Sequence, residues 1–353
     1  MNTTLARARV AVAAVVSFAA VVSFAAVGCG PDPDTSTPPI ANTPAAEPAA
    51  APTAEEPAGT VVPLPGGPEG IVITSTGVVA VAVRGPDGIR LLDTDGTERA
   101  FVPTASAARH LSLVTPNGPV LAPLEGTDQL LLVDADTATV TTTISDVGTQ
   151  PHDAVAAADG TIVVTNEMGG GVVFVRDGMI SASLPAGPVQ PGGAAAVGDY
   201  VAVADVQGNG VWIYSGPEQR LVTQAPVGTK LTHATAVGDD LVAFADTDGG
   251  SVFIERIAPR VTEIARIEAP GNPYGLAYDP QRRLLFVTLT ESNVLRVLDM
   301  TDPTSPTLVR DVPTVRQPNS VAVDPSTGTT LVTGSNPGED SVLQIIPAEL
   351  VRP

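Results

Sequence analysis

Three histidines are the residues in this sequence best suited to carry chemistry. His110, His152 and His233 are separated by about 40 and about 80 residues, so they recur at multiples of one interval. Neutral imidazole nitrogens are good ligands for zinc and copper, and a nearby carboxylate can complete such a site. The histidines therefore raise a metal-binding hypothesis, which depends on the elements that carry them.

Those elements are predicted to be short β-strands in a repeating unit. Each unit reads as a strand, a turn rich in Gly or Asp-Pro, a second strand, a polar turn and a third strand that ends near Asp, with no long helical periodicity. The two clearest copies occupy residues 272–280, 284–288 and 292–299, and residues 317–325, 330–333 and 341–345.

Aligning all units on their first strand indicates seven copies, 40 to 45 residues apart. The aligned residues are Glu69, His110, His152, Gly193, His233, Tyr274 and Asn319. Seven units of three or four strands predict an all-β fold, a seven-bladed β-propeller over residues 59–350. The last unit lacks a fourth strand, and residues 60–64 could supply it, which would close the ring and remove an exposed sheet edge.

In a propeller the first strand of each unit lines the central channel. The alignment thus predicts a ring in which His110, His152, His233 and Glu69 could bind one zinc or copper ion. Further ring candidates are Asp153, Tyr274 and Asn319. Two alternatives stay open at this point: polar residues that merely line a water-filled channel, and a site for an organic or peptide ligand.

The unit at residues 272–299 resembles the repeat of the YVTN-type, YncE-like seven-bladed propellers, within the quinoprotein amine dehydrogenase-like superfamily. This resemblance implies the fold and names no reaction, since propellers host many functions. A second resemblance, to exported zinc metallochaperones built on propellers, favours metal handling as one alternative. A lactonase or dehydrogenase is another, but we identify no catalytic residue, and we expect a module that binds a protein or a small ligand rather than an enzyme.

The N-terminus predicts export. Arg7 and Arg9 precede an apolar run over residues 10–27, and Gly28 precedes Cys29, which is the order of a secretory signal with cleavage after residue 28. The sequence from Ala26 to Cys29 resembles the lipobox of bacterial lipoproteins, which implies a lipid on Cys29. An uncleaved membrane anchor is the rival reading of this run. With cleavage, we expect an extracytoplasmic protein tethered to the outer face of the cell membrane.

Residues 29–58 consist mostly of Pro, Ala, Thr and Glu, which predicts a disordered stalk between the lipid and the propeller. The chain as a whole is acidic, with a formal net charge of −20. Such a charge argues against nucleic acid as a partner and leaves the lipid as the membrane contact.

Overall fold

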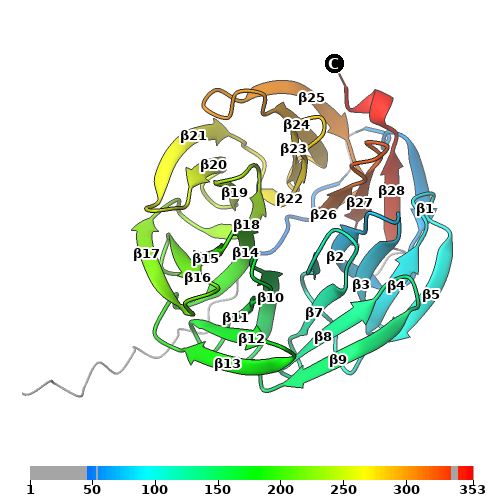
Figure 1. The fold of residues 1–353 in the computed structure, drawn as a ribbon. Coiled ribbons are helices and arrows are strands. Elements are labelled where there is room, and N and C mark those ends of the chain that lie inside the picture. The colour runs from blue at the N-terminus through cyan, green and yellow to red at the C-terminus, as the bar shows by residue number, and fades with distance from the viewer. Residues whose placement is uncertain (1–45, 53–54, 335–340, 353) are drawn as a thin grey trace, which may run out of the picture. The chain divides into compact units, whose positions relative to one another are not determined.

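Strands make up nearly all of the regular structure of this protein. The computed structural model describes residues 46–52, 55–334 and 341–352, and its strands form seven four-stranded antiparallel sheets around a central axis (Figure 1). The helix within these residues is the single 3-10 turn η1 (Ala348–Leu350). The predicted seven-bladed propeller is therefore confirmed, whereas the predicted signal and Cys29 lie outside the described residues.

The blades are numbered 1 to 7 from the innermost strand of each sheet. The innermost strands are β2 (Gly67–Ile73), β6 (Ser112–Leu113), β10 (Pro151–Ala156), β14 (Pro191–Val197), β18 (Leu231–Ala236), β22 (Pro273–Asp279) and β26 (Pro318–Val323). The second strands are β3 (Val79–Arg84), β7 (Val120–Leu124), β11 (Ile162–Asn166), β15 (Tyr200–Asp205), β19 (Leu241–Asp246), β23 (Leu284–Leu289) and β27 (Thr330–Gly334). The third strands are β4 (Gly88–Leu92), β8 (Gln129–Asp134), β12 (Val172–Arg176), β16 (Gly210–Ser215), β20 (Ser251–Arg256), β24 (Val294–Asp299) and β28 (Val342–Ile346). The outer strands are β5 (Glu98–Pro103), β9 (Thr139–Ser145), β13 (Met179–Leu184), β17 (Arg220–Pro226), β21 (Thr262–Glu268), β25 (Thr307–Pro313) and β1 (Thr60–Pro63).

The second strand of blade 1 shows why these short apolar runs fold into blades. Successive side chains of a strand point to opposite faces of the sheet. Val79 and Val81 pack into a cluster shared with blade 7, whereas Ala80 and Ala82 pack into a cluster shared with blade 2, and all four are fully buried. A strand that is buried on both faces has no polar side, so the sequence reads as a continuous run of Val and Ala.

The ring is closed by the two ends of the domain. Strand β1 pairs antiparallel with β28, with Thr60 opposite Ile345 and Pro63 opposite Val342, so the N-terminal strand completes blade 7 (Figure 1). This pairing confirms the closure predicted for residues 60–64. It covers the edge of β28, which would otherwise present unpaired backbone groups.

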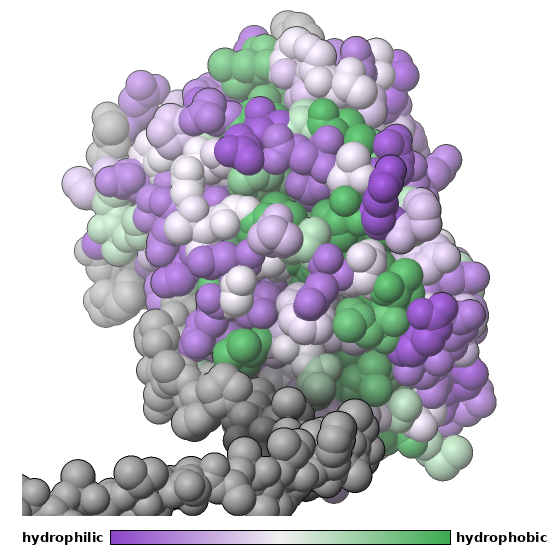
Figure 2. Space-filling view, turned by 90° about the vertical axis from the view of Figure 1, so that its left-hand side faces the viewer, coloured by the Kyte–Doolittle hydropathy of each residue, from purple (hydrophilic) through white to green (hydrophobic). Residues whose placement is uncertain are grey.

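Exposed large hydrophobic side chains are few among the described residues. Figure 2 shows hydrophobic residues scattered among hydrophilic ones on one side of the molecule. The most exposed large hydrophobic residues are Met179 and Leu308, at 67% and 57%, both on outer strands. Within the described residues, no helix has the length and apolar character needed to cross a bilayer. The innermost strands, by contrast, enclose a cavity at the centre of the ring.

Candidate functional site

A β-bulge at the start of the innermost strands positions the side chains at one end of the channel. In six blades the pairing between the first and second strands shifts register near the beginning of the first strand. A bulge re-aims the side chains next to it. Two successive residues of each innermost segment therefore form two ring positions.

The strand pairing assigns the members of both positions. The first ring position holds Glu69, Arg109, His152, Gly192, Thr232, Tyr274 and Asn319. The second holds Gly70, His110, Asp153, Gly193, His233, Gly275 and Ser320. The sequence alignment had combined these two positions into one, so His110 and His233 are equivalent in the repeat, whereas His152 lies one residue earlier. The physical reason is the bulge, which adds a residue that the strand pattern does not reveal.

The three imidazoles nevertheless lie together. The ring centroid of His110 is 4.5 Å from that of His152 and 4.5 Å from that of His233. The ring of Tyr274 follows at 4.3 Å from His233. The three histidines therefore lie within ring contact of one another in a chain through His110, although the partners differ from one histidine to the next.

His110 is held by a carboxylate. Its Nδ1 is 3.2 Å from Oδ2 of Asp153, which also accepts a hydrogen bond from the backbone N–H of Ala194. The other oxygen of Asp153 accepts from the N–H of Ala154. Together these contacts hold the carboxylate of Asp153 in place beside the His110 ring. The histidine that Asp153 contacts is thus His110 and not His152, which precedes Asp153 in sequence.

His233 is an uncharged imidazole in a buried position. Burial lowers its pKa well below the usual value, and electrostatic interactions with His110, His152 and Arg109 lower it further. Its Nδ1 is buried and has no hydrogen-bond partner among the described residues. Another part of the His233 side chain is exposed and lines the channel, where it could contact a ligand.

His152 lies between two glutamates. Its Nδ1 is 3.1 Å from Oε2 of Glu167 and 3.3 Å from Oε1 of Glu125. Burial alone would lower the pKa of His152, but the ion pairs with the two carboxylates outweigh it and raise the pKa to about 9. In return, the pKa of Glu125 is lowered to about 2 despite burial, through His152 and Arg84.

Glu125 and Glu167 were not identified as site residues from the sequence. Each follows directly after the second strand of its unit, Val120–Leu124 in blade 2 and Ile162–Asn166 in blade 3. The sequence signal that could have identified them is that two glutamates occupy equivalent positions in neighbouring units, and that a channel histidine lies in one of these units. Among the described residues, Glu125, His152 and Glu167 form the group whose ligand atoms lie within 4.8 Å of one another, as a metal site requires.

The other predicted ring residues have different partners. Glu69 forms an ion pair with Arg84 at 2.7 Å and lies 3.9 Å from Arg109. Asn319 donates to the carbonyl of Pro68 and accepts from Thr333, which links blades 7 and 1. The structure therefore does not bring Glu69 and the three histidines together as one set of ligands.

A short segment of the predicted stalk, residues 46–52, lies at the same end of the channel. Glu47 forms an ion pair with Arg109 at 2.7 Å. The side chain of Gln317 donates to the carbonyl of Pro48, Asn293 donates to the carbonyls at positions 51 and 52, and the N–H of Ala49 donates to Thr290. The composition predicted disorder for this segment, but its backbone groups are satisfied by polar side chains of blades 6 and 7.

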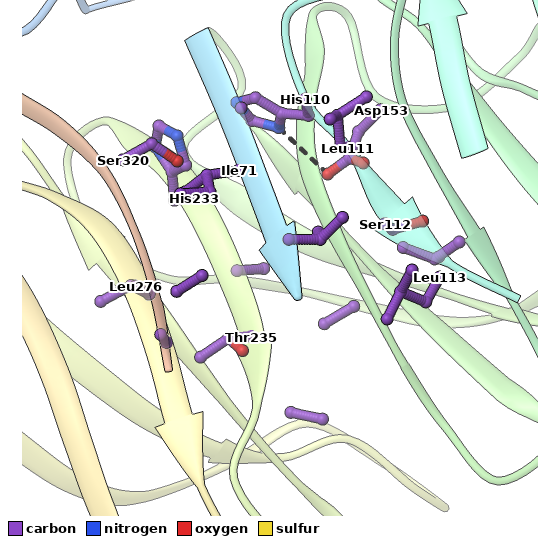
Figure 3. A pocket seen from close by; sticks show the side chains of 18 of the residues that line it. Ile71, His110, Leu111, Ser112, Leu113, Asp153, His233, Thr235, Leu276 and Ser320 are labelled. Atoms are coloured by element: carbon purple, nitrogen blue, oxygen red, sulfur yellow. Dashed lines mark hydrogen bonds and ion pairs between the residues drawn. The ribbon is translucent and has the colours of Figure 1, made fainter. Parts of the chain in front are cut away.

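The channel itself is a cavity of about 470 Å³ whose walls carry mainly aliphatic side chains and whose polar side chains gather at one end. His110, Asp153, His233 and Ser320 lie at one end, and Ile71, Leu276 and Leu113 lie along the walls (Figure 3). Alanines of blades 3, 4 and 5 line much of the remaining wall and leave the space open. Ligand pockets for small molecules typically have about 300–1,000 Å³ and the same mixture of apolar walls and few polar groups.

Comparisons with known proteins identify the fold. No family model and no curated protein matches the sequence. Among solved structures, the chain is similar to Kuenenia stuttgartiensis hydrazine synthase, with a TM-score of 0.68, 16% identity and coverage of 82% of this chain and 98% of that chain. It is similar to virginiamycin B lyase from Staphylococcus aureus, with a TM-score of 0.66, 16% identity and coverage of 81% and 98%. It is also similar to U3-55K, with a TM-score of 0.71, 14% identity and coverage of 83% and 100%. Likeness at this identity shows the propeller fold alone, so function must be argued from the site.

Proposed function

We propose that this chain is an extracytoplasmic binding module, anchored by lipid on Cys29, whose central channel takes a small and mostly apolar organic ligand with a hydrogen-bonding end. The observation that supports it best is the cavity of about 470 Å³, which is lined mainly by aliphatic side chains and has His233 at one end. The His233 side chain lines this end of the cavity and is only partly buried, so its exposed part can contact the polar end of a ligand.

The side chains at the polar end favour a hydroxyl, carbonyl or carboxyl group on the ligand. His110 and Ser320 lie beside His233 at this end (Figure 3). Because the walls carry mostly Ala, Val, Ile and Leu, the body of the ligand would be hydrocarbon. Burial of that hydrocarbon would provide most of the binding free energy, at roughly 25 cal/mol per Å².

Calorimetric titration with 1-octanol and with octanoate tests the channel. The protein for this experiment is the Cys29→Ala chain, which carries no lipid that could bind the probe. We expect binding near one equivalent, and we expect the bulky Ala236→Trp change in the channel wall to abolish it. Val140→Trp is the matched control, since Val140 lies on an outer strand and is 41% exposed. Binding that survives Ala236→Trp would rule out the channel as the site.

Metabolic labelling with a fatty acid tests the anchor separately. If the chain is cleaved and lipidated, we expect label on the wild-type chain and no label on the Cys29→Ala chain. An unlabelled wild-type chain would contradict lipid anchoring and would leave the channel proposal intact.

A further inference from the structure

The group formed by Glu125, His152 and Glu167 has the geometry of a metal site. The two distances from Nδ1 of His152 to the carboxylate oxygens are 3.1 and 3.3 Å. Zinc binds nitrogen and carboxylate oxygen at about 2.0–2.2 Å in tetrahedral geometry, which separates neighbouring ligand atoms by roughly 3.3–3.5 Å. The observed separations are close to this spacing.

The outer oxygens of both glutamates are fixed by other side chains. Oε2 of Glu125 accepts a hydrogen bond from Arg84 at 2.9 Å, which leaves Oε1 directed at His152. Oε1 of Glu167 accepts from Gln190 at 3.0 Å, and Oε2 faces His152 and also accepts from Gln150 at 3.1 Å. Metal-binding carboxylates are commonly oriented in this way by hydrogen bonds from a surrounding shell.

A proton on His152 cannot satisfy this arrangement fully. Nδ1 carries at most one hydrogen, and it makes a hydrogen bond with Oε2 of Glu167. Oε1 of Glu125 is then left buried with no hydrogen-bond partner among the described residues. A divalent cation in place of the proton would contact all three ligand atoms at once. Two carboxylates and a neutral imidazole also balance its charge.

We infer that Glu125, His152 and Glu167 form a binding site for one divalent first-row transition-metal ion. Zinc is the natural probe, because one nitrogen and two carboxylate oxygens suit it and leave a further coordination position for water or a ligand. The site joins blades 2 and 3 at the polar end of the channel. It differs from the predicted set of ligands, since Glu69, His110 and His233 take no part. It is also independent of the ligand proposed for the channel.

The side chains of this site are nearly excluded from solvent, with 11% of Glu125 and 5% each of His152 and Glu167 exposed. We therefore expect slow release of the ion and a proton released on binding, because the imidazole must be neutral to bind metal.

Titration of the full chain with zinc alone, after treatment with EDTA, tests this site. We expect about one equivalent to bind, and we expect Glu125→Gln and His152→Gln each to weaken binding at least 100-fold. X-ray absorption of the zinc-loaded chain should show nitrogen and oxygen ligands at about 2.0–2.2 Å. His110→Gln and His233→Gln are matched controls, because His110 is the ring neighbour of His152, His233 is the ring neighbour of His110, and neither belongs to the proposed site.

Three results would overturn the site. The first is absence of zinc binding to the wild-type chain. The second is undiminished binding in Glu125→Gln together with His152→Gln, where circular dichroism shows that both variants are folded. The third is equal loss of binding in His110→Gln and His233→Gln, which would favour the histidine ring instead. Octanol binding is measured on the same variants, so that failure of the metal site and failure of the channel are distinguished.

Discussion

His110 of blade 2 and His233 of blade 5 face each other at the end of the channel, with ring centroids 4.5 Å apart. Both occupy the same position of the repeat, and the bulges of the innermost strands bring them together across the ring. His110 is bound to Asp153, whereas His233 has no such carboxylate, and burial holds the pKa of His233 well below its usual value. His110 therefore lies beside a carboxylate, whereas His233 stays uncharged.

Replacement of His233 by Phe is expected to reduce the sensitivity of the fold to acid. A histidine whose pKa is lower in the folded state contributes stability above its unfolded pKa of about 6.5, and that contribution is lost as the pH falls below this value. Between pH 7.5 and pH 5 the wild-type chain should lose up to about 2 kcal/mol more unfolding free energy than the variant. Urea unfolding at both pH values measures the difference. Equal losses of unfolding free energy in the two chains would show that folding does not lower the pKa of His233.

Replacement of Val62 by Asp is expected to weaken the closure of the ring. Val62 lies opposite Leu343 and packs against the cluster shared by blades 1 and 7. Burial of a carboxylate there, with the loss of the apolar contact, should cost about 2–3 kcal/mol. Val61→Asp is the matched control, because Val61 is on the same strand, points to the other face and is 41% exposed. Thermal unfolding should show a large decrease for the first variant and almost none for the second.

Much of this fold could be predicted from the sequence because its unit repeats. Strand runs between Gly and Asp turns gave the seven blades, and the missing fourth strand after Ile346 gave the closing pair with residues 60–64. The exact ring position of His152 could not be predicted, because a bulge changes the register without changing the apolar pattern. Glu125 and Glu167 were missed for a related reason. Their partner is contributed by another strand, and the distance between strands is set by pairing rather than by sequence spacing.

The ion pair between Glu47 and Arg109 is expected to contribute weakly to holding residues 46–52 against the propeller. Glu47 is 59% exposed on its side chain, so its ion pair should contribute only about 0.5–1 kcal/mol. Glu47→Gln should therefore accelerate hydrogen exchange of the Ala49 amide, which donates to Thr290, by roughly 2- to 5-fold. Glu56→Gln serves as the control, since Glu56 is exposed and lies beyond this segment. Unchanged exchange in Glu47→Gln would show that the backbone hydrogen bonds alone hold the segment.

The buried carboxyl of Glu255 is expected to lower the stability of the propeller as the pH rises. Burial raises the pKa of this carboxyl to about 7, with a further increase from Glu263 that Arg266 partly offsets, and its Oε2 has no hydrogen-bond partner among the described residues.

The sign of the effect follows from the raised pKa. The folded state favours the protonated carboxyl, so its stability contribution is complete below the unfolded pKa of about 4.5 and is lost as the pH rises toward 7. Glu255→Gln keeps the shape without the charge and should raise the unfolding free energy at pH 8 by about 2 kcal/mol, with a much smaller gain at pH 5. Glu263→Gln, on an exposed side chain, should give a smaller gain at pH 8, because it removes the neighbouring charge but also the exposed ion pair with Arg266. Melting temperatures of the three chains at both pH values test this order, and a destabilised Glu255→Gln chain at pH 8 would mean that the carboxylate has a cationic partner in solution.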